Sequence, residues 1–314
     1  EYYILNVNGN PADFGDEFLV VATQDSTIVE ITPTVTSDGG QAANVPFTIT
    51  LNEGEMYQMF NNSGSENFSY TKIESSSGSG NCAPVAVFAG SKCINIGGCG
   101  ACDHLYEQLL PVTALGTEYI LIPHEEKSST WYRVMAIENG TTLSLNGGAP
   151  INLNAGDVHE FNSNLEYYLT SNNPVSVMQY AQGLQCSDPT GDPMAIQIFP
   201  IDQVIENITF NCFATPLVNN YWTNIVVETA NVGGVILDGN NVSGNFNPVP
   251  SNPTYSFAQI NLAQGNHTLN APGGALVTVY GWGNAESFGY CAGASIKNLV
   301  DDFTFNPNGA CAGT

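Results

Sequence analysis

Short segments rich in β-branched and aromatic residues recur along the whole chain, separated by glycine, asparagine, aspartate and proline. Such segments are typical of β-strands bounded by turns. In Thr142–Leu145 the two leucines share one face and the polar residues share the other. Asn146-Gly147 and Asp238-Gly239 follow such segments and favour tight hairpin turns. Strands are expected at 18–22, 27–32, 46–51, 131–137, 142–145, 167–170, 174–180, 224–228 and 276–282.

Helical periodicity is nearly absent from the sequence. The one candidate, residues 104–109, is long enough for only one or two turns. The pattern therefore predicts an all-β protein.

Three stretches of the chain repeat the same order of parts. Each has three apolar segments, then a hairpin of the form Leu-x-x-Gly, then a β-rich strand followed by a cysteine. The hairpins lie at 51–54, 153–156 and 262–265, and the closing strands at 84–90, 174–180 and 275–281. We predict three tandem, related, antiparallel β-sandwich-like units, stapled by disulfides and packed as one compact body, at residues 1–101, 102–190 and 191–314.

The two connectors that open the second and third units, 102–111 and 191–200, also match. Asp103 and Asp192 stand at the same offset, as do Gln108 and Gln197. Aspartate is favoured at the start of a helical turn, where it accepts backbone N–H groups, so we interpret both aspartates as caps. In a turn, His104 and Glu107 would share a face, which would suit metal binding or acid–base chemistry. The second connector has Pro193 and Ile196 in their place, so capping and packing are what repeat.

Charge narrows the range of partners. Five Lys and Arg residues against 29 Asp and Glu give a net charge of −24, although only 11% of the 314 residues are charged. Such a protein repels nucleic acid and anionic lipid. No apolar run is long enough to span a bilayer, so we expect no direct membrane insertion. Since the chain lacks a basic, apolar leader, we expect its numbering to begin after a removed signal peptide.

Eight cysteines in a lysine-poor chain indicate an oxidising compartment and structural disulfides. Cys99 and Cys102 form a C-x-x-C pair, but no second pair completes a zinc site and no βαβ context supports a redox motif. We expect local bridges, namely Cys186 with Cys212, Cys291 with Cys311, and two within the group Cys82, Cys93, Cys99 and Cys102.

The stretch 90–123 resembles the IgGFc-binding protein N-terminal domain family. Its hallmark is Cys102-Asp103-His104-Leu105-x-Glu107-Gln108-Leu109-x-Pro111, followed by Gly116-Thr117-Glu118-Tyr119; the family often has Pro-Pro where this chain has Leu110-Pro111. The similarity extends over roughly 18–293. It implies an extracellular module of the kind present in mucin-associated animal proteins and large bacterial surface proteins. The resemblance does not imply which ligand this chain binds, and it does not imply that the ligand is immunoglobulin.

Candidate sites for chemistry are few. Nucleophile-elbow, P-loop and H-E-x-x-H motifs are all missing, so we expect neither an enzyme nor a cofactor. Asp188 and Asp192 resemble a calcium loop weakly, and a structural Ca²⁺ ion there is the alternative to simple solubilising charge. Tyr168, Trp222 and Trp282 are candidate contacts for a ligand, with core packing as the alternative. Glycosylation sequons start at Asn61, Asn67, Asn139, Asn207, Asn241 and Asn266.

The leading hypothesis is a secreted or cell-surface, non-enzymatic module that binds or adheres to an extracellular protein or glycan. The alternative is self-assembly with identical chains as a filament or sheath, through the apolar N-terminal strand 2–7. A glycan-active enzyme is the third hypothesis and requires two facing carboxylates.

Overall fold

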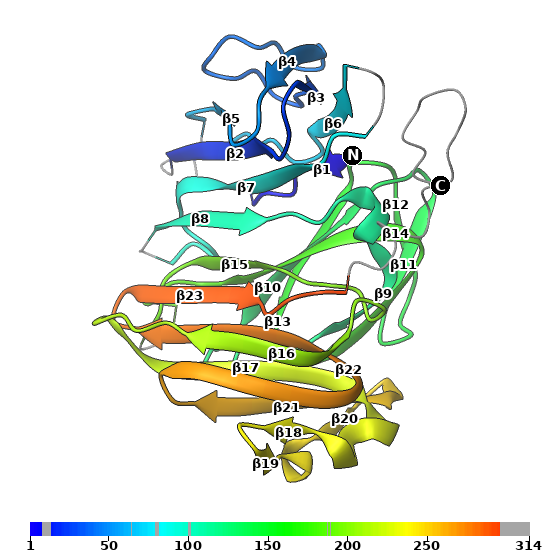
Figure 1. Cartoon of the computed structure of the whole chain (residues 1–314), viewed down its shortest axis with the longest axis vertical. Coiled ribbons are helices and arrows are strands. Elements are labelled where there is room, and N and C mark those ends of the chain that lie inside the picture. Colours follow the sequence, from blue (N-terminus) through cyan, green and yellow to red (C-terminus); the bar gives the residue numbers. More distant parts are fainter. Residues whose placement is uncertain are drawn as a thin grey trace. The chain divides into compact units, whose positions relative to one another are not determined.

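The computed structural model describes residues 1–7, 14–63, 65–78, 82–99, 102–186, 188 and 190–295 (Figure 1). The prediction of an all-β protein is confirmed. The strands form four antiparallel sheets and, within the described residues, only three short 3₁₀ helices accompany them, η1 (Val112–Ala114), η2 (Thr229–Gly234) and η3 (Ser243–Asn245). None of the described helices is long and apolar enough to cross a membrane. The chain divides into two compact units, one of residues 1–95 and 103–115 and another of 96–102 and 116–295. The division into three repeated units stays a prediction.

The first unit contains two four-stranded sheets. One has the order β1-β6-β3-β4 and the other the order β5-β2-β7-β8. Alternation places Phe18 and Val20 in the interior, where Phe18 packs edge-on against Phe68. The strands are β1 (Tyr2–Tyr3), β2 (Phe14–Ala22), β3 (Thr27–Thr32), β4 (Phe47–Leu51), β5 (Met56–Phe60), β6 (Lys72–Ser77), β7 (Val85–Ile94) and β8 (Asp103–Gln108).

The second unit contains a seven-stranded and an eight-stranded sheet, each curled around one long strand. In the first sheet, strand β14 (Tyr167–Ala181) pairs with β9 (Gly116–Leu121), β10 (Thr130–Ala136), β11 (Thr141–Leu145) and β15 (Met194–Gln197), and the edges are β12 (Ile151–Leu153) and β13 (Val158–Ser163). In the second, strand β22 (Gly265–Gly283) pairs with β16 (Ile205–Cys212), β17 (Val218–Glu228), β18 (Ile236–Leu237) and β23 (Glu286–Cys291). Strands β19 (Asn240–Asn241), β20 (Asn247–Val249) and β21 (Asn252–Leu262) complete it.

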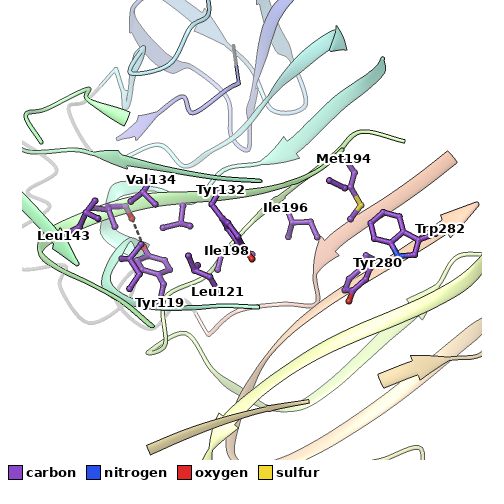
Figure 2. Close-up of a cluster of buried hydrophobic side chains, with 14 residues drawn as sticks. Tyr119, Leu121, Tyr132, Val134, Leu143, Met194, Ile196, Ile198, Tyr280 and Trp282 are labelled. Carbon is purple, nitrogen blue, oxygen red and sulfur yellow. Dashed lines mark hydrogen bonds between the residues drawn. The ribbon is translucent and has the colours of Figure 1, made fainter. Parts of the chain in front are cut away.

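One core of the second unit draws residues from both sheets (Figure 2). Tyr119 and Tyr132 from the first sheet share it with Tyr280 and Trp282 from the second. The Tyr119 hydroxyl donates to the carbonyl of Val175 at 2.6 Å, which satisfies its polar end inside an apolar core.

The N-terminal segment belongs to the first unit's own sheet. Strand β1 pairs with β6, and the N–H of Ile4 donates to the carbonyl of Thr71 at 3.0 Å. Ile4 and Leu5 are fully buried. The apolar character that favoured a strand offered to a neighbouring copy is therefore explained by burial within the unit.

Both connectors form strands, so the interpretation of Asp103 and Asp192 as caps of helical turns is wrong. Residues 103–108 are β8, paired with β7, and residues 194–197 are β15, paired with β14. The Asp103 carboxylate accepts the N–H of the next residue, His104, at 2.7 Å instead of those further along a turn. The backbone groups of both connectors are satisfied by the strand that precedes each of them in the chain, a pairing that the residues of the connectors alone do not reveal.

Candidate binding surface

The hallmark connector builds an exposed sheet face in the first unit. Within β8, Leu105 points into the core, and alternation turns His104, Tyr106 and Gln108 to the other side. Tyr106 is 39% exposed, unusual for a large side chain in a strand that also supplies the core. We call this side of the sheet, with β5, β2 and β7, the outer face.

Aromatic rings stack in a row across the outer face. The Tyr106 ring lies parallel to that of Phe88 at 5.7 Å and close to parallel with His104 at 5.5 Å. The Tyr106 ring thus has two aromatic neighbours, and the residue stays partly exposed to solvent. Farther along, Lys92 Nζ lies 3.9 Å from the centre of the Phe60 ring.

A buried carboxylate fixes this row. Glu17 is only 5% exposed, and its two oxygens meet His104 Nε2 at 2.8 Å and Gln58 Nε2 at 2.6 Å. Burial, and to a smaller extent the charge of Glu17, raises the pKa of Tyr106 to about 12. The Tyr106 hydroxyl is therefore protonated at neutral pH and available as a donor. Together, Tyr106, His104 and Glu17 offer hydrogen bonds and apolar surface. They do not include the two facing carboxylates that glycoside hydrolysis requires.

Gly90 allows the backbones of strands β7 and β8 to lie close together. It lies on β7 opposite Glu17 on one side and opposite Tyr106 on the other. A Cβ atom at this position would lie 1.7 Å from the carbonyl oxygen of Leu105. Only glycine lets β8 approach β7 this closely.

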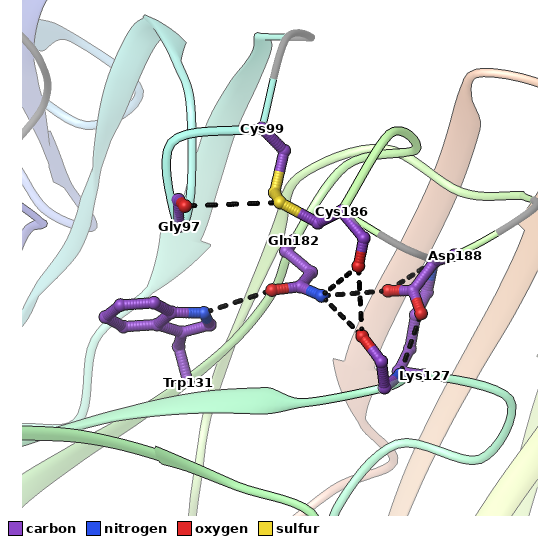
Figure 3. The surroundings of a disulfide bond; sticks show 8 residues. Gly97, Cys99, Lys127, Trp131, Gln182, Cys186 and Asp188 are labelled. Carbon is purple, nitrogen blue, oxygen red and sulfur yellow. Dashed lines mark hydrogen bonds and ion pairs between the residues drawn. A yellow bond between two sulfur atoms is a disulfide. The ribbon is translucent and has the colours of Figure 1, made fainter.

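A second polar cluster lies in the second unit beside the disulfide between Cys99 and Cys186 (Figure 3). The Gln182 side chain bridges it, accepting from Trp131 Nε1 at 3.3 Å and donating to Asp188 Oδ2 at 3.1 Å. Asp188 Oδ1 also accepts the N–H of Ser128 at 2.7 Å. The cluster thus ties Asp188 to Gln182 and Ser128.

The positive charge beside the candidate calcium ligands is Lys127. Its side chain is fully buried, lies 4.0 Å from Asp188, donates to the Thr190 carbonyl and faces the Trp282 ring at 4.3 Å. Burial lowers the pKa of Lys127, and the charges of Asp188 and Asp192 oppose this effect. The structure thus places Asp188 in an ion pair with Lys127. Across the described part of the chain, no three His, Cys, Asp or Glu side chains gather as metal ligands.

The cysteines differ from the predicted local pairing. Cys186 pairs with Cys99, 87 residues away, so the expected bridge to Cys212 is wrong; Cys212 is a buried thiol. Cys82, Cys93 and Cys102 are disulfide-bonded. Cys291 is a thiol that donates to the Gln197 carbonyl at 3.0 Å, and its expected partner, Cys311, lies outside the described residues.

The three aromatic residues predicted as ligand contacts do not form one surface. Trp282 is fully buried and Trp222 packs against the same core, whereas Tyr168 packs against another cluster. The Tyr168 hydroxyl donates to Glu118 at 2.5 Å. Sequence reasoning missed Tyr106, whose signal was a tyrosine alternating with Leu105 inside the connector.

The predicted sequons differ in accessibility. Asn61 is only 2% exposed, and its side chain accepts the N–H of Ser63 at 3.1 Å, so it is closed to a glycan in the folded unit. Asn67 is half-buried and accepts the N–H of Ser69 at 2.8 Å. The other four sites are exposed, at Asn139, Asn207, Asn241 and Asn266.

Comparison with known proteins identifies the relatives of this chain. The family model described as "IgGFc binding protein" matches residues 1–281. The chain belongs to this family. It is also 27% identical over 315 residues to a human protein named "IgGFc-binding protein", a match that covers 96% of the chain and 6% of the human protein. No solved structure matches.

Proposed function

We propose that the chain is a non-enzymatic binding module of an extracellular protein and that it contacts a protein partner through the outer face. Family membership supports a binding role. The disulfide between Cys99 and Cys186 supports an oxidising, extracellular location. The chain spans 6% of its human relative, so the partner of that larger protein is a hypothesis for this module.

The observation that carries the proposal is the exposure of Tyr106 within the connector that marks the family. Packing in the core explains the presence of Leu105, but it does not explain the exposed and stacked side chains of Tyr106 and His104. Tyrosine is enriched at protein interfaces, where it supplies apolar area and a hydrogen bond together. Phe88 and His104 already stack with the Tyr106 ring, which leaves less of its faces to a sugar ring. The geometry therefore favours a protein over a glycan.

The test is a binding comparison between the wild-type chain and Tyr106→Ser, with immunoglobulin G Fc fragment and a glycan array as probes. We expect the Fc fragment to bind and the substitution to weaken binding at least about tenfold, as at an interface hot spot. Tyr168→Phe is the matched control, because it changes an aromatic residue outside the outer face. Unchanged Fc binding by Tyr106→Ser, or binding to glycans alone, would contradict the proposal.

The filament hypothesis loses the feature on which it depended, since the N-terminal segment is buried in its own unit. Electron microscopy of the purified chain provides the direct check. Long ordered polymers of wild-type protein would restore that hypothesis.

A further inference from the structure

Strand β5 is an open sheet edge of unusual composition. Its sequence, Met-Tyr-Gln-Met-Phe, contains no charge and no proline, and within the described residues it pairs only with β2. Met56 is 62% exposed and Phe60 is 37% exposed. Edge strands are normally protected by charges, proline or bulges because their free backbone groups accept a further strand.

The hydrogen-bond pattern shows which backbone groups of β5 face outward. The carbonyl of Glu55 accepts from Ala22 and the N–H of Asn61 donates to Asp16, both at 3.0 Å. Bonding alternates along an antiparallel pair, so residues 57 and 59 bond to β2, and Met56, Gln58 and Phe60 direct their groups away. The Phe60 carbonyl does so, accepting the N–H of Asp38 at 3.0 Å.

The corresponding strands of the second unit are protected. Strand β21 pairs with β17 as β5 pairs with β2, but β20 covers its other side. Strand β13 pairs with β10 and ends its sheet, and it carries Glu160, which accepts from Arg133 at 2.6 Å. An edge strand that has no charged residue and no further strand on its outer side is therefore peculiar to β5 among these three strands.

Charge indicates what covers this edge. The exposed residues Glu53 and Glu55 precede β5, and Asp38 lies at its other end. A second copy of this chain, with its own net charge of −24, would be repelled. An extended segment with an apolar middle and a basic residue beside Glu53 and Glu55 matches the strand and these carboxylates, whereas Lys92 already lies over the Phe60 ring at the other end.

We propose that β5 binds an extended, basic peptide segment of a protein partner, which adds antiparallel to the sheet beside Met56 and Gln58. The backbone groups would supply the hydrogen bonds, and the flanking carboxylates would select lysine or arginine. This inference rests on the proposed function, since it describes the kind of partner that a binding module of this family takes.

The probe is the capped peptide Lys-Thr-Val-Thr-Val-Thr-Lys, with a glutamate-flanked version and a version N-methylated at alternate residues. Gln58→Pro removes an outward N–H while leaving the bonds to β2 in place. Gln58→Ala controls for loss of the side-chain bond to Glu17. Asn162→Pro places proline on the edge strand β13, at an outward position by the same alternation, because the N–H of Ala136 bonds to the carbonyl of Asp157.

We expect the lysine-flanked peptide to bind the wild type, Gln58→Ala and Asn162→Pro alike, and to bind Gln58→Pro at least about tenfold more weakly. N-methylation and glutamate flanks should weaken binding by a similar factor, and hydrogen exchange at Met56 and Gln58 should slow when the lysine peptide binds. If Gln58→Pro does not fold, the N-methylated peptide and hydrogen exchange on wild-type protein still decide.

Absence of binding to the wild type, or equal binding of the N-methylated peptide, would overturn the inference. Tyr106→Ser separates it from the proposed function. If Tyr106→Ser abolishes Fc binding but Gln58→Pro leaves peptide binding unchanged, the outer face is supported as the binding surface and the inference about β5 is wrong. If Gln58→Pro weakens peptide binding but Tyr106→Ser leaves Fc binding unchanged, the inference about β5 is supported and the proposed role of the outer face is wrong.

Discussion

The imidazole of His104 on β8 places its Nε2 atom 2.8 Å from the carboxylate of Glu17 on β2, across the intervening strand β7. The two ends of this contact differ in environment, because the His104 side chain is 54% exposed and that of Glu17 is 7% exposed. The contact thus couples a buried acceptor to a group that a partner can touch.

His104→Ala should remove this coupling at little cost to folding. The His104 end of the pair is 54% exposed, so water can replace the imidazole on the Glu17 carboxylate, and Glu17 keeps its bond from Gln58. We expect urea unfolding to show a loss of less than about 1 kcal/mol, while partner binding weakens because Tyr106 loses one of its stacking neighbours. A much larger loss of stability would mean that His104 serves the fold and not the surface.

Gly90→Ala should, in contrast, lower the stability of the first unit substantially. The added Cβ would meet the backbone of Leu105, which cannot rotate away as a side chain can, so β8 must shift. We expect a loss of about 2 kcal/mol or more in the free energy of unfolding of the first unit, together with loss of binding. Gly40→Ala is not a matched control, because its φ of +89° adds strain of its own. Gly78 has open space around its Cβ position and no such strain, and Gly78→Ala should be nearly neutral.

Local sequence predicted the strands well because β-propensity and turn residues act over a few positions. The segment expected at 142–145 is β11, and Asn146, with a φ of +53°, begins the turn after it. The connectors were missed because their strand character depends on antiparallel pairing with β7 and β14, the strands that precede them, and not on the residue pattern of the connectors themselves. For the same reason, no spacing rule could join Cys99 to Cys186.

Breaking that disulfide should destabilise the second unit strongly. It closes a loop of 87 residues, and a loop of that size is worth roughly 4 kcal/mol in the unfolded state. We expect Cys99→Ser with Cys186→Ser to lower the melting temperature and to make the segment around Asp188 more sensitive to protease. Calorimetry and limited proteolysis provide the readouts. Equal melting of the double variant and the wild type would show that the polar cluster around Gln182 holds this segment without the bond.

Acid should destabilise the second unit through His124. This residue is 3% exposed, and burial, aided by the charge of Lys127, lowers its pKa to about 3. Between pH 6.5 and 3 the unfolded chain binds a proton at this position and the folded chain does not, so stability falls as the pH falls below 6.5. At pH 4.5, two units below the unfolded value, His124 contributes a loss of about 2–3 kcal/mol.

The substitution His124→Phe isolates this effect from the many carboxylates that also titrate. Phenylalanine can keep the edge-on packing against Tyr280 and Trp282, and it removes the Nε2 atom, which has no hydrogen-bond partner in the structure. Urea unfolding at pH 7 and pH 4.5 should therefore show a decline about 2–3 kcal/mol smaller for the variant than for the wild type. Parallel declines in the two proteins would place the protonated imidazole in contact with water or with an acceptor, contrary to its burial here.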